Sequence, residues 1–302
     1  RYEVRLALDG GDIVSRAFAV RRIVLASGRI FLNGEPIFMH GVLHQGYWPE
    51  SLLTPPSPDA LEEELRAIKA SGFNTVRVHA VVMGAYFYHL CDILGLLVWQ
   101  DMPSSDSRAL PIWERRRGLA EEAGTRPAEL DEIRRTPDSR AGHWAELRAM
   151  VAWLRAFACI AVWVPFNEGW GQSETLATVQ WLREADPGRL VDAASGWNDL
   201  QPEAPGDFVD VHNYEGKPFG NLTETFHYWP FPRQGRALAL GEYGGLALVV
   251  EGHEWAPGLS WGYGGLSHTA GELRERLGGL LARLETLVCE GLSAAIYTQW
   301  SD

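Results

Sequence analysis

The feature that most constrains the fold of this chain is a regular alternation between short apolar segments and longer amphipathic ones. Eight short segments are rich in Val, Ile, Leu and Ala and run with few polar breaks, which is typical of strands buried on both faces. They span residues 37–43, 75–79, 96–100, 160–166, 190–193, 208–213, 237–242 and 294–299. Eight such strands separated by helices over about 270 residues favour an α/β fold, a (β/α)8 TIM barrel, over an open sheet.

Helical patterns lie between these strands, and the clearest covers residues 58–71. Ser57 is suited to the N-cap, Pro58 to the first helical position and Gly72 to the end of the helix. Further helices are predicted over residues 86–94, 141–158, 173–185 and 271–290. Alternation of the two patterns therefore supports the barrel.

The first 28 residues differ from the rest. Two alternating stretches flank Asp-Gly-Gly-Asp at positions 9–12, which predicts a β-hairpin. Two strands are too few to be stable alone, so we expect residues 1–28 to be the C-terminal strands of an immunoglobulin-like β-sandwich, present only in part. We expect residues 29–302 to form the barrel, truncated after its eighth strand because no closing helix follows Trp300.

Two of the apolar strands end on a glutamate. The fourth leads into Asn167 and Glu168, and the seventh ends at Glu242, 74 positions later (242 − 168 = 74). Barrel enzymes place their chemistry at the C-terminal ends of strands, and hydrolysis of a glycosidic bond needs a pair of carboxylates. For an isolated Asn-Glu pair, capping of the next helix is the alternative interpretation.

The composition of the chain disfavours some classes of binding partner. The net charge of −12, from 39 acids against 27 Lys and Arg, disfavours nucleic acid, whose phosphates need a basic surface. No apolar stretch is long enough to span a bilayer, so we expect no membrane association. The three cysteines are odd in number and far apart, which does not indicate a disulfide framework and slightly favours the cytoplasm. A homo-oligomer is compatible with the sequence.

Several motifs, taken in order, resemble those of glycoside hydrolase family 2, in particular its β-galactosidase and β-glucuronidase-like barrels. The resemblance covers about residues 12–302. It rests on FLNGEPIFMHGVLHQG, GFNTVRVH, CDILGLLVWQDMP, IAVWVPFNEGWGQ, SGWND, DVHNY, GEYGG and LSAAIYTQWSD.

The resemblance implies a retaining β-glycosidase that cleaves terminal β-linked sugars by double displacement, with Glu168 as acid/base and Glu242 as nucleophile. It also implies that Arg77 steadies the nucleophile and that Asn167 contacts the sugar 2-hydroxyl. A hydrogen bond from a tyrosine to the nucleophile is expected of Tyr214, and a platform under the sugar of Trp300. By position, five further residues are expected to line the pocket: His79, Asp101, Trp170, Trp197 and His212.

The resemblance implies a β-glycoside as the partner and no cofactor. The preferred substrate is a β-galactoside, with β-glucuronide or β-mannoside as alternatives. A non-catalytic carbohydrate-binding barrel is a second alternative.

A metal-dependent barrel hydrolase is a rival interpretation, with His40, His44, His79, Asp101 and His212 as ligands. Residues four apart on a strand lie about 13 Å from each other, and HxH does not occur. No metal site is therefore predicted.

Two long loops each admit two interpretations. Residues 104–140 form a lid or partner surface near the site, or an insertion without function. The hydrophobic stretch of residues 246–250 and the Trp-rich loop of residues 253–263 form a wall of a sugar subsite, or a packed cover over the rim of the barrel.

Overall fold

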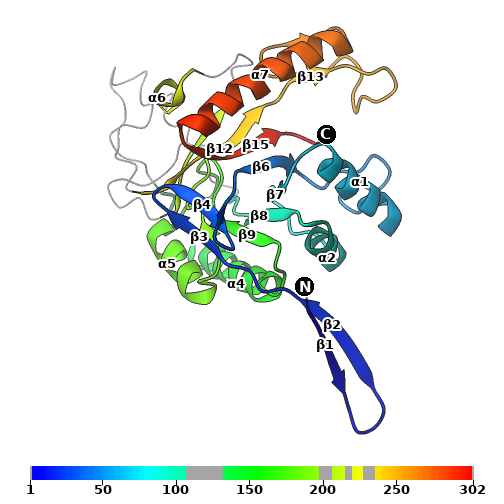
Figure 1. Cartoon of the computed structure of the whole chain (residues 1–302), viewed down its shortest axis with the longest axis vertical. Coiled ribbons are helices and arrows are strands. Elements are labelled where there is room, and N and C mark those ends of the chain that lie inside the picture. Colours follow the sequence, from blue (N-terminus) through cyan, green and yellow to red (C-terminus); the bar gives the residue numbers. More distant parts are fainter. Residues whose placement is uncertain (1, 107–131, 197–205, 215–219, 227–234, 301–302) are drawn as a thin grey trace.

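A computed structural model of the protein describes residues 2–106, 132–196, 206–214, 220–226 and 235–300 (Figure 1). Within these residues eight parallel strands form one sheet, ordered β10-β9-β8-β7-β6-β15-β12-β11. They are β6 (Met39–His44), β7 (Thr75–Val78), β8 (Leu97–Asp101), β9 (Ile160–Val164), β10 (Leu190–Val191), β11 (Phe208–Asn213), β12 (Ala237–Gly244) and β15 (Leu292–Thr298). Each coincides with a predicted strand, which confirms the barrel.

The sheet curls until its two edge strands, β10 and β11, come close. The backbone N–H of Asp207, just before β11, donates to the carbonyl of Val191 at 2.7 Å. In return the Asp207 carboxylate accepts from the N–H of Val191 at 2.7 Å. The barrel is thereby nearly closed, and the C-terminal ends of all eight strands share one rim.

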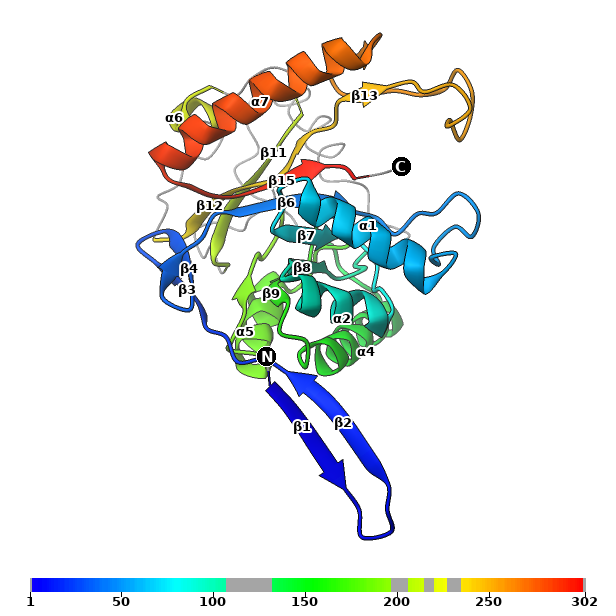
Figure 2. The same ribbon diagram turned by 45° about the vertical axis from the view of Figure 1, so that its right-hand side comes forward.

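Helices lie outside this sheet, as Figure 2 shows. They are α1 (Pro58–Ala70), α2 (Ala85–Leu94), α4 (Pro137–Leu154), α5 (Thr175–Ala185) and α7 (Ala270–Glu290), all five predicted, together with the short α6 (Leu222–Thr225), which was not. The Ser57 hydroxyl accepts from the N–H of Ala60 at 3.1 Å, which confirms the predicted N-cap. No helix in the described residues is long and apolar enough to cross a membrane.

A small antiparallel sheet covers the other end of the barrel. It consists of β3 (Ile23–Ala26), β4 (Arg29–Leu32) and β5 (Glu35–Pro36). Ile23 and Ile30 are buried in one cluster with Met39, Phe208 and Ala237, the first residues of three barrel strands. The β3–β4 hairpin, which spans the predicted domain boundary at residue 28, therefore packs on the barrel.

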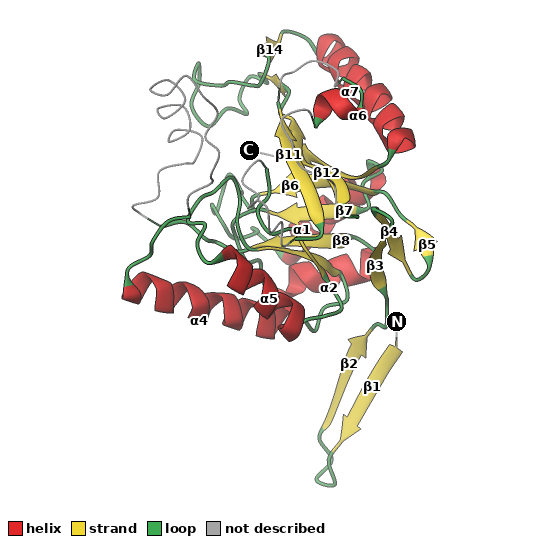
Figure 3. Cartoon of the chain, turned by 90° about the vertical axis from the view of Figure 1, so that its left-hand side faces the viewer, coloured by secondary structure: helices red, strands yellow, loops and turns green. Residues whose placement is uncertain are grey.

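The first two strands, β1 (Tyr2–Ala7) and β2 (Ile13–Phe18), form an antiparallel hairpin that projects away from the barrel (Figures 1 and 3). The turn at residues 9–12 confirms the hairpin prediction, with the N–H of Leu8 donating to the Asp12 carbonyl at 2.9 Å. Tyr2, Val4 and Leu6 alternate on one face and are all exposed.

Candidate active site

A cavity of about 320 Å³ opens at the C-terminal rim of the barrel. Twelve residues line it: His79, Ala80, Asp101, Met102, Ser104, Ser105, Asn167, Glu168, Trp170, Tyr214, Glu242 and Tyr263. Seven of these were predicted from the sequence, namely His79, Asp101, Asn167, Glu168, Trp170, Tyr214 and Glu242. Another cavity, of about 420 Å³ beside α1 and α2, has no acidic residue in its lining.

Glu242 lies near the end of β12 with its side chain buried. The hydroxyl of Tyr214 donates to its carboxylate. Three nitrogens surround its Oε1: Nη1 of Arg77 at 3.4 Å, Nδ1 of His212 at 3.7 Å and Nδ1 of His79 at 4.0 Å. Burial alone would raise the pKa of Glu242, but the charges on His212 and Arg77 outweigh it and lower that pKa below its ordinary value. The group is thus kept ionised, as a nucleophile must be.

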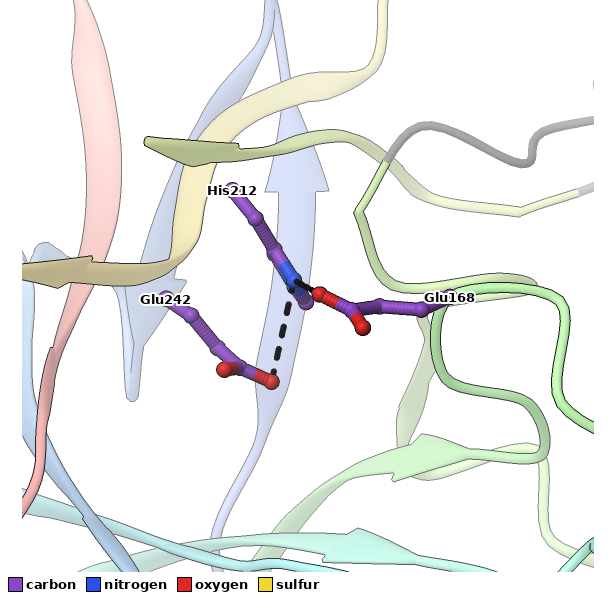
Figure 4. Close-up of side chains that lie close together, drawn as sticks. All are labelled: Glu168, His212 and Glu242. Carbon is purple, nitrogen blue, oxygen red and sulfur yellow. Dashed lines mark hydrogen bonds and ion pairs between the residues drawn. The ribbon is translucent and has the colours of Figure 1, made fainter. Parts of the chain in front are cut away.

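Glu168 follows β9, where the chain turns sharply. Its backbone has a φ of +50°, a left-handed conformation that is uncommon outside glycine, and its N–H donates to the carbonyl of Ser195 at 2.9 Å. The carboxylate Oε1 lies 2.7 Å from Nδ1 of His212. Figure 4 shows Glu168 and Glu242 approaching one imidazole from two sides, and the three ligand atoms lie within 4.8 Å of one another.

Arg77, on β7, is fully buried behind the residues that line the cavity. Its guanidinium donates to both oxygens of Asp101 at 3.0 Å and to Oδ1 of Asn167 at 2.8 Å. Burial would raise the pKa of Asp101, but Arg77 and His79 lower it, so this carboxylate is also ionised. Because the oxygen of Asn167 is used by Arg77, its amide NH₂ remains to donate to a ligand.

A second polar layer lies behind these residues and was not predicted. Ser195 accepts from Nη1 of Arg77 at 2.8 Å and donates to Oδ2 of Asp210 at 2.5 Å. Nε2 of His212 lies 2.9 Å from the same hydroxyl. His212 was expected to line the pocket, whereas the structure places its ring beneath the cavity with both nitrogens in contact with protein groups.

The remaining predicted residues lie elsewhere. Trp300, just after β15, donates its backbone N–H to the carbonyl of Leu43 and does not line the cavity. Trp197 falls outside the described residues. His44 lies 2.9 Å from the carboxylate of Glu64, and the ring of His40 packs on Phe73 at 4.8 Å. These two histidines are therefore held by other residues and do not form a metal site with His79, Asp101 and His212.

The three atoms of Glu168, His212 and Glu242 are spaced closely enough to surround a cation. Each nevertheless has an ionisable protein neighbour already, at 2.7 Å between His212 and Glu168 and at 3.4 Å between Glu242 and Arg77. The polar atoms of the centre are thus partnered by protein groups.

An aromatic wall of the cavity lies in the Trp-rich loop, for which a sugar-subsite wall was one of the two interpretations. Tyr263 lines the cavity and stacks on Tyr214, with ring centroids 4.0 Å apart and planes inclined by 14°. Trp261 meets Tyr263 edge-on at 5.1 Å and is 68% exposed. The short strands β13 (Ala247–Leu248) and β14 (Leu266–Ser267) pair and join the two ends of this Trp-rich loop.

Comparisons with known proteins agree with this fold. Residues 23–234 match the model of the glycosyl hydrolases family 2 TIM barrel domain. The chain is 24% identical over 278 residues to a β-galactosidase of Pectobacterium atrosepticum, covering 87% of this chain and 25% of that protein. It is 26% identical over 267 residues to a β-galactosidase of Aeromonas hydrophila, covering 84% of this chain and 24% of that one.

Among solved structures, a family 2 β-galacturonidase from Eisenbergiella tayi, bound to galacturonate, superimposes with a TM-score of 0.70. Identity is 18%, with 99% of this chain and 50% of that chain covered. A β-glucuronidase from Parabacteroides merdae gives a TM-score of 0.67 at 16% identity, covering 98% of this chain and 36% of that chain. These likenesses concern the fold.

The chain spans about a quarter of the length of the related galactosidases and is matched by the family model over most of its barrel. The chain therefore belongs to glycosyl hydrolases family 2.

Proposed function

We propose that this chain carries the catalytic centre of a retaining β-glycosidase that releases terminal β-linked sugars in the manner of a β-galactosidase. One observation carries the proposal: carboxylate oxygens of Glu168 and Glu242 lie within 4.8 Å of each other, with both residues lining the same cavity. Retaining enzymes need carboxyl groups about 5 Å apart, whereas inverting enzymes need about 6.5–9.5 Å to admit a water.

The two environments suit two different tasks. Glu242, ionised beside Arg77 and hydrogen-bonded by Tyr214, is the nucleophile that attacks the anomeric carbon. Glu168 has a less crowded carboxylate, 18% exposed, and protonates the departing oxygen. It then takes a proton from the water that hydrolyses the glycosyl-enzyme.

Asn167 supplies the contact to the sugar. With its oxygen held by Arg77 at 2.8 Å, its NH₂ donates to the 2-hydroxyl, a bond that strengthens as positive charge develops at the anomeric carbon. His79, Asp101 and Trp170 form the remaining sugar contacts.

The charge of the cavity favours a neutral sugar over a uronate. Three acids line it, Asp101, Glu168 and Glu242, and its lining in the described part of the chain includes no Lys or Arg. A substrate carboxylate would meet like charges in a site of low dielectric. A β-galactoside is therefore the preferred substrate, ahead of the β-glucuronide.

The test uses 4-nitrophenyl β-glycosides. We expect the β-galactoside to exceed the β-glucuronide and β-galacturonide by at least about 100-fold in kcat/KM. Glu242→Gln should abolish turnover. Glu168→Gln should slow it by about 10²–10⁴-fold.

Labelling with 2-fluoro glycosides then identifies the nucleophile. An adduct on the peptide that contains Glu242 supports the mechanism, and an adduct on another peptide contradicts it. Sugar binding without turnover in the unmodified chain would instead favour a carbohydrate-binding barrel.

A further inference from the structure

His212 joins the two carboxylates without lining the cavity. Its Nδ1 lies 2.7 Å from Oε1 of Glu168 (Figure 4). Its Nε2 lies 2.9 Å from the hydroxyl of Ser195. A Cβ built on Gly196 would lie 3.3 Å from the imidazole, so this glycine allows the backbone to pack against the ring. The ring is therefore held in place and faces Glu168 with one particular nitrogen.

The hydroxyl of Ser195 decides which nitrogen carries a proton. A serine hydroxyl has one hydrogen to donate and two lone pairs to accept with. The hydrogen goes to Oδ2 of Asp210 at 2.5 Å, and one lone pair accepts from Nη1 of Arg77 at 2.8 Å. The remaining lone pair faces Nε2 of His212, which must therefore be the donor.

With Nε2 protonated, Nδ1 of a neutral imidazole can only accept. A hydrogen bond of 2.7 Å to Glu168 then requires a proton on the carboxyl group. In the alternative form this proton lies on Nδ1 instead, so that His212 is an imidazolium that donates to an ionised Glu168. In either form Glu168 and His212 hold one proton between them.

The surroundings favour retention of this proton. Oε1 of Glu242 lies 3.7 Å from Nδ1, and Oδ2 of Asp210 lies 4.0 Å from Nε2. Arg77 donates to Ser195, the hydroxyl that faces the ring, and the ring of Tyr214 packs edge-on at 6.3 Å. Burial would lower the pKa of His212, but the carboxylates of Glu242, Glu168 and Asp210 raise it overall.

We propose that His212 is a positioning residue that shares with Glu168 the proton delivered to the leaving group. This role rests on the glycosidase function proposed above. As Glu242 bonds to the anomeric carbon and the glycosidic bond breaks, the proton moves from the pair to the departing oxygen. After this transfer, the carboxylate of Glu168 faces the lone pair on Nδ1 of His212.

That arrangement is a strong proton acceptor. In the second half of the reaction, the oxygen of water bonds to the anomeric carbon and Glu242 departs. One proton of the water returns to the pair, which restores the starting state. His212 thus supports Glu168 in both the acid and the base role.

The decisive variant is His212→Phe, which keeps a flat ring and removes both nitrogens. On an alkyl β-galactoside, whose leaving group needs protonation, kcat/KM should fall by about 10- to 100-fold. On the 2,4-dinitrophenyl glycoside, whose leaving group departs unaided, it should change by less than about 3-fold. The alkaline limb of the kcat/KM profile on the alkyl glycoside should move to lower pH, because the pair no longer retains its proton.

Equal losses on both substrates would overturn the proposal, since they would make His212 a general support of the fold or of substrate binding. An alkaline limb that stays in place would also overturn the proposal. So would a limb that moves to higher pH, because it would mean that His212 acts as a cation with a proton of its own instead of sharing one with Glu168. Ser195→Ala removes the acceptor that holds the proton on Nε2 of His212. The alkaline limb should then also move to lower pH, by a smaller amount than in His212→Phe. Melting temperatures confirm that both variants are folded.

A measurement that does not depend on turnover distinguishes a failure of this proposal from a failure of the proposed glycosidase function. In ¹⁵N NMR spectra of the intact chain, a neutral His212 should show its proton on Nε2. A neutral ring protonated on Nδ1 would sink the proposal even in an active enzyme. If the unmodified chain hydrolyses no β-glycoside, the proposed function fails, while the tautomer is still tested by the spectrum.

Discussion

Nη1 of Arg77 lies 3.4 Å from Oε1 of Glu242, and both side chains are buried. The same guanidinium forms two hydrogen bonds with Asp101. One cation thus compensates two carboxylates in a region of low dielectric, where an unpaired charge is costly.

Replacing Arg77 with Met should therefore destabilise the fold as well as inactivate the site. We expect a loss of about 3–5 kcal/mol in the free energy of unfolding, because Asp101 and Glu242 are left without their partner. Urea unfolding measures it. Arg66→Met, which breaks an exposed pair with Glu62, is the matched control, with a change of about 0.5 kcal/mol at most. Similar losses in the two variants would contradict the compensation argument.

A methyl group at Gly241 should disrupt the layer behind the cavity. A Cβ there would lie 2.0 Å from Oδ2 of Asp210, the oxygen that holds Ser195. We expect Gly241→Ala to lower kcat by at least about 10-fold and to destabilise the chain by about 1–3 kcal/mol. Gly142→Ala, in α4 with open space around its Cα, should be neutral or stabilising by up to about 1 kcal/mol.

The acidic limb of the pH profile should report Glu242, which must be ionised to attack. Because His212 and Arg77 lower its pKa against the effect of burial, the limb should fall below pH about 4.3, the ordinary value for a glutamate. Tyr214→Phe removes a hydrogen bond to the ionised form, so the limb should move to higher pH. Tyr297→Phe, whose ring packs on Tyr243 and whose hydroxyl has no described contact with the carboxylate, should leave it unchanged. A limb above pH 5 in the unmodified chain would contradict this assignment.

Stability should decline in acid partly through His143. This ring stacks on Phe166 at 5.7 Å, and burial followed by the charge of Arg135 lowers its pKa to about 4. Between that value and about 6.5 the unfolded chain binds the proton and the folded chain does not, so stability is lost as pH falls through this window. Between pH 7.5 and pH 4.5, His143→Phe should lose about 1–2 kcal/mol less free energy of unfolding than the unmodified chain. This figure is reduced for partial solvent access. Thermal melting at the two pH values measures it.

Trp261 should contribute to binding of the leaving group. It is exposed and contacts Tyr263, which lines the cavity, so it offers a face on which a second sugar can stack. We expect Trp261→Ala to raise KM for a disaccharide by about 5- to 20-fold and to change KM for a methyl glycoside by less than 2-fold. Trp255→Ala, also exposed on the same loop, is the control. Equal effects on the two substrates would favour a loop that merely covers the rim.

The predictable part of this protein is the part with a local pattern. Unbroken apolar runs marked all eight barrel strands, and Ser57 and Pro58 marked the start of α1. Glu168 and Glu242 could be singled out because a buried strand that ends on an acid is unusual in itself. The short β3–β5 sheet was missed, since its strands are too brief to differ from a loop in sequence.

Ser195 and Asp210 had no such signal. Each is a single small polar residue beside an apolar segment, and their pairing depends on how β10 and β11 meet at the seam of the barrel. The placement of His212 beneath the cavity depends on the same seam. Tyr263 lies in a loop, and long-range contacts hold it at the rim: its ring stacks on Tyr214 and its backbone N–H donates to the carbonyl of Gly245.

The order of residues along the chain determined the strands, the helices and the two acids, because these follow from burial and hydrogen bonding among near neighbours. Tertiary structure alone decided that two carboxylates 74 positions apart share one imidazole, and which nitrogen of that imidazole bears the proton. The physical reason is that closure of the barrel fixes distances across it to within an ångström, and a hydrogen bond depends on distances of that size.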